Sequence, residues 1–175
     1  MGRHGATFRL AFSAMLTALA VLFLLAADLV PTAQLALCCF AGFFVGAAVS
    51  TFGYGAGLLC WGAASALGLM LLPTKGSALL FLLAFGIYPV LKGKLERLGP
   101  APVAWAVKLV YCNVTLAVCL LGLSAILFPR MEARALPLPV LWLACVAVFI
   151  LYDVTFTRVM IFYQGRVLPI LRRQK

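Results

Sequence analysis

Lys108, Asn113 and Asp153 are the residues whose types and positions could do chemistry, because each lies within a long apolar stretch of the chain. The first two stand in "WAVKLVYCN" and the third in "YDVTFTR". Holding a charge deep in a membrane costs free energy, so an ionisable residue within a span is a candidate functional site. An amide near the middle of a bilayer also needs a bonding partner, from another helix or from water.

Helical spacing predicts which of these side chains meet. Lys108 lies six residues beyond Pro102, a plausible first helical position, and is therefore about 9 Å along its helix. Asp153 lies about 7 Å from Arg158 by the same rise per residue. If Arg158 marks the membrane interface, the two depths are similar. The sequence therefore predicts a Lys108–Asp153 pair between the last two spans.

Other polar residues extend this pair into a predicted intramembrane polar cluster. Its members are Glu96, Lys108, Asn113, Asp153 and Arg158. Lys92, four residues before Glu96, is predicted instead to belong to a solvated helix end. Pro89 predicts a kink or a loosened turn near the cluster. Whether the cluster is a functional site or a neutralised structural lock is left open by the sequence.

No enzyme or metal signature accompanies these residues. The chain lacks paired carboxylates, an H-E-x-x-H helix, a G-x-x-x-x-G-K-[ST] loop and a G-x-S-x-G elbow. We therefore expect no intrinsic enzymatic activity, no catalytic residue, no metal and no cofactor. The cysteines show no C-x-x-C spacing and are predicted to be small buried apolar side chains. They are Cys38, Cys39, Cys60, Cys112, Cys119 and Cys145.

Membrane spans must position these residues. The chain is 66% hydrophobic and 10% charged, whereas soluble domains average roughly 45–50% apolar residues. Apolar stretches of the ~20 residues that cross a bilayer recur along it. We expect one integral membrane domain covering residues 1–175. The net charge of +10 lies mainly in the connections between spans, where it sets orientation in the membrane rather than binding nucleic acid.

Hydropathy predicts an all-α protein with six transmembrane helices. Pro or Gly occupies every break, and no stretch alternates with the period of barrel strands. The first apolar run is longer than a signal-peptide core and is interpreted as a retained span. The predicted spans cover about residues 8–30, 33–51, 54–72, 76–91, 103–128 and 138–162.

The distribution of basic residues predicts the orientation of these spans. Lys75, Arg130 and Arg134 fall on the side opposite the termini. The positive-inside rule therefore predicts that both termini are cytoplasmic. The basic residues that group with the termini are Arg3, Arg9, Lys92, Lys94, Arg97, Arg158, Arg166, Arg172, Arg173 and Lys175.

Small residues four positions apart mark faces on which helices can pack closely. Ala14 and Ala18 form such a face on the first span, and Gly42 and Gly46 form one on the second. Lipid gives no hydrophobic drive for helix association, so close backbone approach and dispersion contacts supply it. Each face is either an internal seam or a surface for another protein, and spacing alone does not decide between them.

Four motifs together resemble a known family. "SAMLTALAVLF", "FGIYPVLKGKLERL", "WAVKLVYCN" and "YDVTFTRVMIFYQGRVLPIL" look like those of a small bacterial six-helix membrane family. That family is grouped with the substrate-binding S components of energy-coupling factor (ECF) transporters. Its motif residues correspond here to Tyr88, Pro89, Lys92, Glu96, Trp105, Lys108, Asn113, Tyr152, Asp153 and Arg158.

The resemblance implies an S-component-like bundle in the bacterial cytoplasmic membrane that captures a vitamin-like small molecule from outside. Such a subunit docks on a membrane coupling subunit that carries two cytoplasmic ATPases. The family's alanine face toward the coupling subunit corresponds here to Ala14 and Ala18. Candidate substrate-binding residues near an outward pocket are Asp28, Gln34, Asn113 and Trp142.

Three functional hypotheses remain after this comparison. The first is the S component of an ECF-type vitamin or micronutrient uptake transporter. The second is a non-transporting scaffold or accessory membrane protein, in which the polar cluster locks helices and the alanine face is an internal seam. The third is a small membrane enzyme acting on lipid, which would have to rest on Asp153, Glu96 or Lys108 alone.

Overall fold

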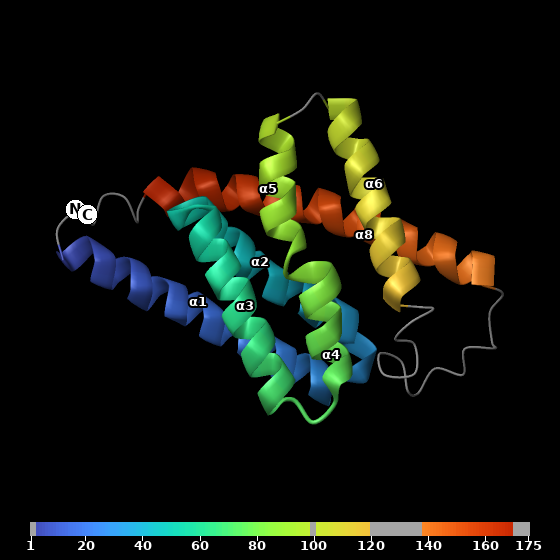
Figure 1. Cartoon of the computed structure of the whole chain (residues 1–175), viewed down its shortest axis with the longest axis horizontal. Helices are drawn as coiled ribbons and strands as arrows, with labels where there is room; N and C mark the ends of the chain where they lie inside the picture. The colour runs from blue at the N-terminus through green and yellow to red at the C-terminus, as the bar shows by residue number, and fades with distance from the viewer. Residues whose placement is uncertain (1–2, 99–100, 120–137, 170–175) are drawn as a thin grey trace.

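The computed structural model describes residues 3–98, 101–119 and 138–169, and every element within these ranges is helical. Figure 1 shows the start of α1 and the end of α8 at the same end of the molecule. The α-helices are α1 (Arg3–Leu29), α2 (Gln34–Phe52), α3 (Tyr54–Leu71), α4 (Lys75–Leu80), α5 (Tyr88–Leu98), α6 (Ala101–Ala117) and α8 (Leu138–Phe162). Shorter elements are the 3-10 turn η1 (Pro31–Ala33) and the π-helical segments η2 (Phe81–Phe85) and η4 (Tyr163–Val167).

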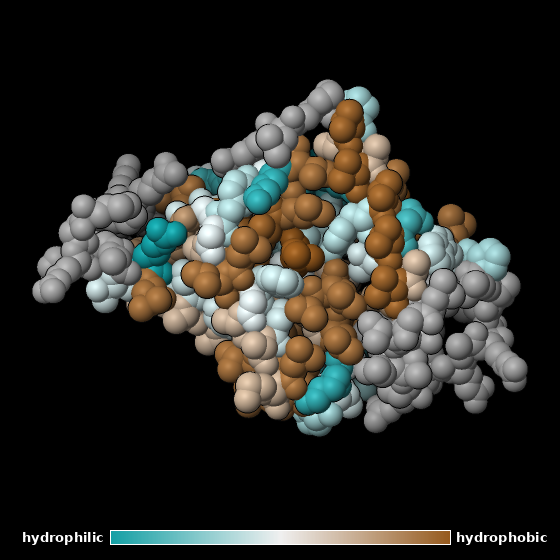
Figure 2. Space-filling model, in the orientation of Figure 1, coloured by the Kyte–Doolittle hydropathy of each residue, from teal (hydrophilic) through white to brown (hydrophobic). Residues whose placement is uncertain are grey.

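Five segments of the described chain are long and apolar enough to cross a membrane, and the expectation of an all-helical membrane protein is confirmed to that extent. The helix Pro102–Ala117 is apolar but shorter. The other segments are Thr7–Leu29, Pro31–Phe52, Tyr54–Leu71, Lys75–Leu95 and Trp142–Val167. Large apolar side chains face outward along most helices, as expected where lipid is the solvent. On the face in Figure 2, strongly hydrophilic residues form only a few separate spots, one of them over the turn between α3 and α4.

A tight turn joins the second and third spans, whose predicted bounds of 33–51 and 54–72 leave two residues between them. Only Gly53 separates α2 from α3, and its backbone has φ +90°, a conformation that residues with a Cβ rarely adopt. Its N–H bonds the carbonyl of Val49 at 2.9 Å, which closes the last turn of α2. The first three helices pack against one another around this turn.

The glycine face of α2 is an internal seam. A Cβ on Gly42 would lie 2.7 Å from the carbonyl oxygen of Phe85, and one on Gly46 would lie 2.5 Å from the Phe156 ring. Both glycines are buried, so α8 and the fourth span approach the α2 backbone directly. The close approach maximises dispersion contacts where lipid supplies no hydrophobic drive.

The fourth span is broken, where the sequence predicts one helix over 76–91. The α-helix α4 ends at Leu80, η2 follows with the wider π-helical pattern, and a turn at Gly86 and Ile87 precedes α5. The N–H of Gly86 bonds the carbonyl of Phe81 at 2.7 Å, which is the i→i−5 spacing of a π-helix. Figure 1 shows α4 and α5 as two separate pieces of this span.

The kink predicted from Pro89 is present as this break, which ends directly before Tyr88 and Pro89. Pro89 has no N–H to donate to the carbonyl of Phe85, four residues earlier. The hydroxyl of Tyr152 lies 3.4 Å from that carbonyl and donates to it instead. Trp61 Nε1 donates to the carbonyl of Leu82 at 3.2 Å in the same way. The backbone groups at the break are thus bonded by side chains of other helices.

The predicted end of the fourth span is wrong, and the predicted end of the fifth span lies outside the described residues. The stretch 92–98, expected to be a connection, continues α5 to Leu98, and α6 begins at Ala101. Lys92 lies within α5 and does not mark its end. Its ammonium is bonded within the protein rather than solvated. The fifth span, expected at 103–128, is helical to residue 119, and residues 120–128 lie outside the described part of the chain.

Candidate functional site

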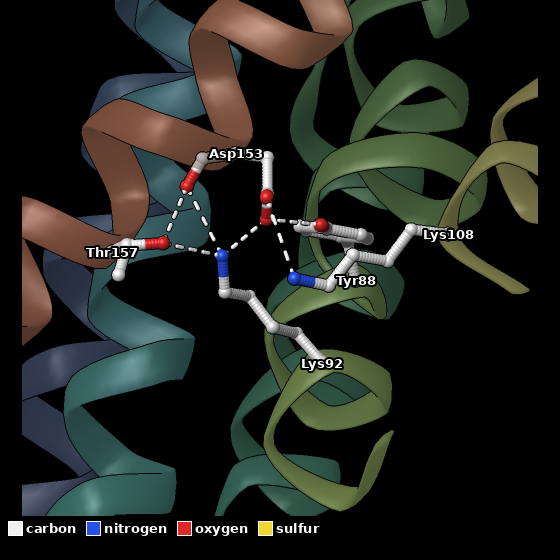
Figure 3. A network of polar contacts seen from close by, with 5 residues as sticks. All are labelled: Tyr88, Lys92, Lys108, Asp153 and Thr157. Atoms are coloured by element: carbon white, nitrogen blue, oxygen red, sulfur yellow. Dashed lines mark hydrogen bonds and ion pairs between the residues drawn. The ribbon is translucent and has the colours of Figure 1, made fainter. Parts of the chain in front are cut away.

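Asp153 is the hub of a buried polar network that joins α5, α6 and α8. Its carboxylate contacts the Lys92 ammonium and accepts a hydrogen bond from the Tyr88 hydroxyl. Lys108 Nζ lies 3.4 Å from Asp153 Oδ2, so the pair predicted from helical spacing is present. Figure 3 shows these side chains converging with Thr157, the fifth member of the network.

Lys92 is bonded more extensively than Lys108. Its ammonium also donates to the Asp153 carbonyl at 3.0 Å and to Thr157 Oγ1 at 2.6 Å. Thr157 Oγ1 in turn donates to the same carbonyl at 2.8 Å. The Lys92 ammonium also lies 5.6 Å from the centre of the Phe156 ring, within cation–π range. Lys92 therefore meets oxygen atoms and an aromatic face where water is excluded.

All three charged members are removed from the surrounding medium. Lys92 is 3% exposed, Lys108 5% and Asp153 3%. Buried ions are tolerated only where partners compensate for lost solvation, and removing one partner of such a pair strongly destabilises a protein. The network therefore links α5, α6 and α8 at one depth in the bundle. Each of its charged groups is bonded to at least one other charged group.

The expectation of a solvated Lys92 is wrong. Sequence reasoning assigned the lysine to a helix end because it stands among the charges of a supposed loop. A signal was nevertheless present: Tyr88 and Lys92 are one turn apart on α5, and Asp153 and Thr157 are one turn apart on α8. Residues at that spacing share one helix face, so two polar faces could meet.

Two other predicted cluster members are not found in this network. One lies outside it, and the side chain of the other is not described. Arg158 is exposed, because helical spacing places it on the opposite side of α8 from Asp153 and Phe156. The backbone of Glu96 belongs to α5, and its side chain lies outside the part that the structure describes.

Two predicted substrate-binding residues lie where α1 ends and α2 begins. The carboxylate of Asp28 accepts hydrogen bonds from the hydroxyl and the N–H of Thr74, the latter at 3.3 Å. Gln34 Nε2 donates to Ser77 Oγ at 3.1 Å. Both side chains thus bond the connection and helix that follow α3. They join elements of the bundle to one another and do not converge on one point.

The other two predicted substrate-binding residues bond each other. Trp142 Nε1 donates to Asn113 Oδ1 at 2.9 Å, and Asn113 Nδ2 donates to the Leu109 carbonyl at 2.8 Å. The amide predicted to need a partner within the membrane therefore has one on α8. Asn113 is exposed and stands apart from the Asp153 network, so this bond is a second polar tie between α6 and α8.

Ala14 and Ala18 are both exposed on α1. The buried stripe of the helix runs along its opposite side through Leu16, Ala20 and Leu24. In the described part of the chain, the alanine face is therefore not an internal seam, unlike the glycine face of α2.

An apolar cavity of about 110 Å³ lies between α2, the broken fourth span, α6 and α8. Tyr111 stands at its wall and donates to the carbonyls of Leu83 and Ala84, at 2.6 and 3.1 Å, in the π-helical segment. The cavity could hold a small apolar group, with two hydroxyls, of Tyr111 and Thr115, and several thiols at its edge. Its lining residues include Leu35, Phe85, Cys112, Thr115, Cys119, Cys145 and Phe149.

Cysteine positions fit the expected packing role at most sites. Cys145 and Cys39 are only partly buried, whereas Cys38, Cys60, Cys112 and Cys119 are buried, and all six are free thiols. Among the described residues, no three His, Cys, Asp or Glu side chains are grouped so as to hold a metal ion.

Comparison of the chain with protein-family models, with curated proteins and with solved structures finds no match in any of the three. The functional argument therefore rests on the residues and geometry of this chain.

Proposed function

We propose that the chain is the membrane-embedded substrate-binding component of an ECF-type uptake transporter in a bacterial cytoplasmic membrane, with both termini cytoplasmic. The observation that carries the proposal is the exposed alanine face of α1. Ala14 and Ala18 point away from the bundle. Because their side chains are small, the outer surface of α1 is recessed along one stripe. A helix of a second membrane protein can approach such a stripe closely and gain dispersion contacts that lipid chains give less well.

The partner is a membrane coupling subunit with its two ATPases, because the described chain carries no nucleotide-binding motif of its own. The ligand is a small, vitamin-like molecule that is largely apolar. The apolar cavity beside Tyr111 supports this ligand class, since its walls offer few polar groups. Asp28, Gln34, Asn113 and Trp142 are already bonded within the protein, so they support a strongly polar ligand less well.

A scaffold function is the second candidate, and the Asp153 network favours it. The network's ions are buried and bonded to one another, as in a lock that holds spans together. A scaffold would use the same lock and would bind neither a coupling subunit nor a small molecule.

Affinity purification in mild detergent separates these candidates. The tagged protein is purified from its native membrane, and mass spectrometry identifies the retained proteins and small molecules. The double substitution Ala14→Leu/Ala18→Leu is compared with Ala106→Leu, a single change of the same kind at an exposed position of α6. We expect the wild type and Ala106→Leu to retain a coupling subunit with ATPases, and the double variant to lose both while remaining folded.

Recovery of the wild-type protein without ATPases and without a small molecule would reject the transport proposal in favour of a scaffold. Loss of the folded protein on the double substitution would show that the alanine face is needed within the bundle. That result would remove the observation on which the proposal rests.

A further inference from the structure

A second cavity, of about 170 Å³, lies between α2, α5 and α8 and differs in character from the apolar one. Ser50, Lys92, Thr157 and Gln164 supply polar groups to its walls, whereas Val49, Ile161 and other residues supply apolar ones. Ile161 is 63% exposed, so the apolar side of this groove continues onto the outer surface of α8. One site therefore offers hydrogen-bonding groups and an apolar track side by side.

The polar groups at the mouth of the groove are only weakly engaged. Gln164 Nε2 donates to Ser50 Oγ at 3.3 Å, and the Ser50 hydroxyl donates to Met160 Sδ at 3.8 Å. A thioether sulfur is a weak acceptor, so an anionic oxygen would be a better partner for that hydroxyl. Gln164 is exposed and has a second amide hydrogen to donate.

The groove lies at the end of the bundle where positive charge accumulates. α2 and α8 both end there, and the carbonyl of Gly93 on α5 accepts a hydrogen bond from Tyr54, which begins α3 directly after α2. Lys94 and Arg166 are exposed and stand one or two residues from the lining residues Gly93 and Gln164. Among the side chains that the structure describes on α2, α5 and α8, the one carboxylate is the buried Asp153. This end of the groove is therefore electropositive.

We propose that this groove binds an anionic phospholipid. Its phosphodiester accepts hydrogen bonds from Ser50 and Gln164 within the field of the nearby basic residues, and an acyl chain lies along Val49 and Ile161. Basic pockets between spans at the membrane interface suit anionic headgroups for this reason. A soluble phosphate would use the polar part of the site alone, whereas a phospholipid uses both parts. The inference is independent of the proposed transport function.

Lipid retention tests the proposal directly. The protein is reconstituted in vesicles of equal parts phosphatidylcholine and phosphatidylglycerol, extracted in mild detergent and analysed for bound lipid by mass spectrometry. We expect phosphatidylglycerol to be enriched about tenfold over phosphatidylcholine, because only phosphatidylglycerol carries a net negative charge and one or two basic residues near a headgroup give an attraction of that size. Equal retention of the two lipids by the wild-type protein would overturn the proposal without reference to any variant.

The variant Ser50→Ala/Gln164→Ala removes both headgroup donors, and we expect it to retain much less phosphatidylglycerol than the wild type. Its matched control is Gln34→Ala/Ser77→Ala, which removes an equivalent Gln–Ser hydrogen bond at the other end of the bundle. The control should retain as much as the wild type, and equal loss in both variants would refute the assignment to this groove. Excess inorganic phosphate should not displace the lipid. Displacement by inorganic phosphate would reject the phospholipid as the occupant and assign the site to soluble phosphate.

Discussion

At the scale of single residues, Asp153 decides whether the polar network is stable. One carboxylate meets two lysines and a tyrosine, and none of the three charged groups reaches solvent. The two lysines are not equivalent, because Lys92 also bonds the Asp153 carbonyl and Thr157, whereas Lys108 reaches the carboxylate at 3.4 Å. Removing Lys92 therefore leaves more hydrogen-bonding groups without a partner than removing Lys108 does.

We expect Lys92→Met to lower the free energy of unfolding by about 3–5 kcal/mol, the usual cost of breaking a buried pair. Lys108→Met should cost less, about 1–3 kcal/mol, as for one buried hydrogen-bonding partner. The control is Lys94→Met, an exposed lysine two residues along α5, which should change stability by no more than about 0.5 kcal/mol. Reversible denaturation in mixed micelles measures all three, and equal losses at Lys92 and Lys108 would contradict the ranking.

Sequence reasoning placed Lys108 and Asp153 together because the helical rise is fixed and both depths follow from it. It missed Lys92, Tyr88 and Thr157 because a cluster of charges in sequence resembles a solvated connection. Which side chains a lysine reaches depends on how helices far apart in sequence cross. Spacing along one helix does not contain that information.

At the scale of helices, two small-residue faces have different roles. The Gly42 and Gly46 face of α2 contacts α8 and the fourth span, whereas the Ala14 and Ala18 face of α1 contacts none of the described helices closely. Both faces have the same spacing in sequence. Contact decides their roles, and the missing Cβ of glycine permits the closer approach.

Gly46→Ala should lower the free energy of unfolding by about 1–3 kcal/mol, the cost of overpacking. The new Cβ would lie 2.5 Å from Cζ of Phe156 and 3.2 Å from Sδ of Met160, so α2 and α8 must separate. Gly62→Ala on α3 is the matched control, since a Cβ there meets nothing within 4 Å. It should be neutral or stabilise the protein by up to about 1 kcal/mol through the helix preference of alanine. Thermal unfolding in detergent compares them, and equal effects would argue against the seam.

The positions of the helices follow largely from sequence, because Gly and Pro mark their ends and apolar length marks their cores. The break in the fourth span does not. Its π-helical turn depends on donors from other helices, namely Trp61, Tyr111 and Tyr152, which bond the carbonyls of residues 82–85. Pro89 signals that one carbonyl loses its donor, but only the packed structure shows which side chain replaces it.

At the scale of the whole molecule, polar interactions hold α6 to the rest of the bundle. The helix buries a narrow stripe that includes Ala104, Lys108 and Cys112, and most of its other described side chains are exposed. The Asp153 pair, the Tyr111 bonds and the Asn113–Trp142 bond fix it at three levels. In lipid, such bonds add to dispersion in holding helices together. The apolar cavity lies along this weakly packed side of α6.

The orientation of the whole chain depends on whether α6 crosses the membrane. Pro102–Ala117 is shorter than the ~20 residues of a full span, although the helical pattern continues to residue 119. The start of α1 and the end of α8 lie at the same end of the molecule, as an even number of crossings requires. The basic residues Arg9, Lys94, Arg158 and Arg166 belong to this end, and the positive-inside rule predicts that this end is cytoplasmic.

Reporter fusions test this orientation in living cells. A periplasmically active phosphatase fused after Thr74, in the connection between α3 and α4, should be active, whereas the same enzyme fused to the C-terminus should be inactive. A fluorescent protein that matures only in the cytoplasm should give the reverse pattern. The control replaces Lys94 and Arg97 with glutamine and should weaken the bias, because those charges help to retain their end of the chain inside. An active C-terminal phosphatase with an active fusion at Thr74 would mean that α6 does not cross. The termini would then lie on opposite sides, and a coupling subunit with cytoplasmic ATPases would meet a differently arranged bundle.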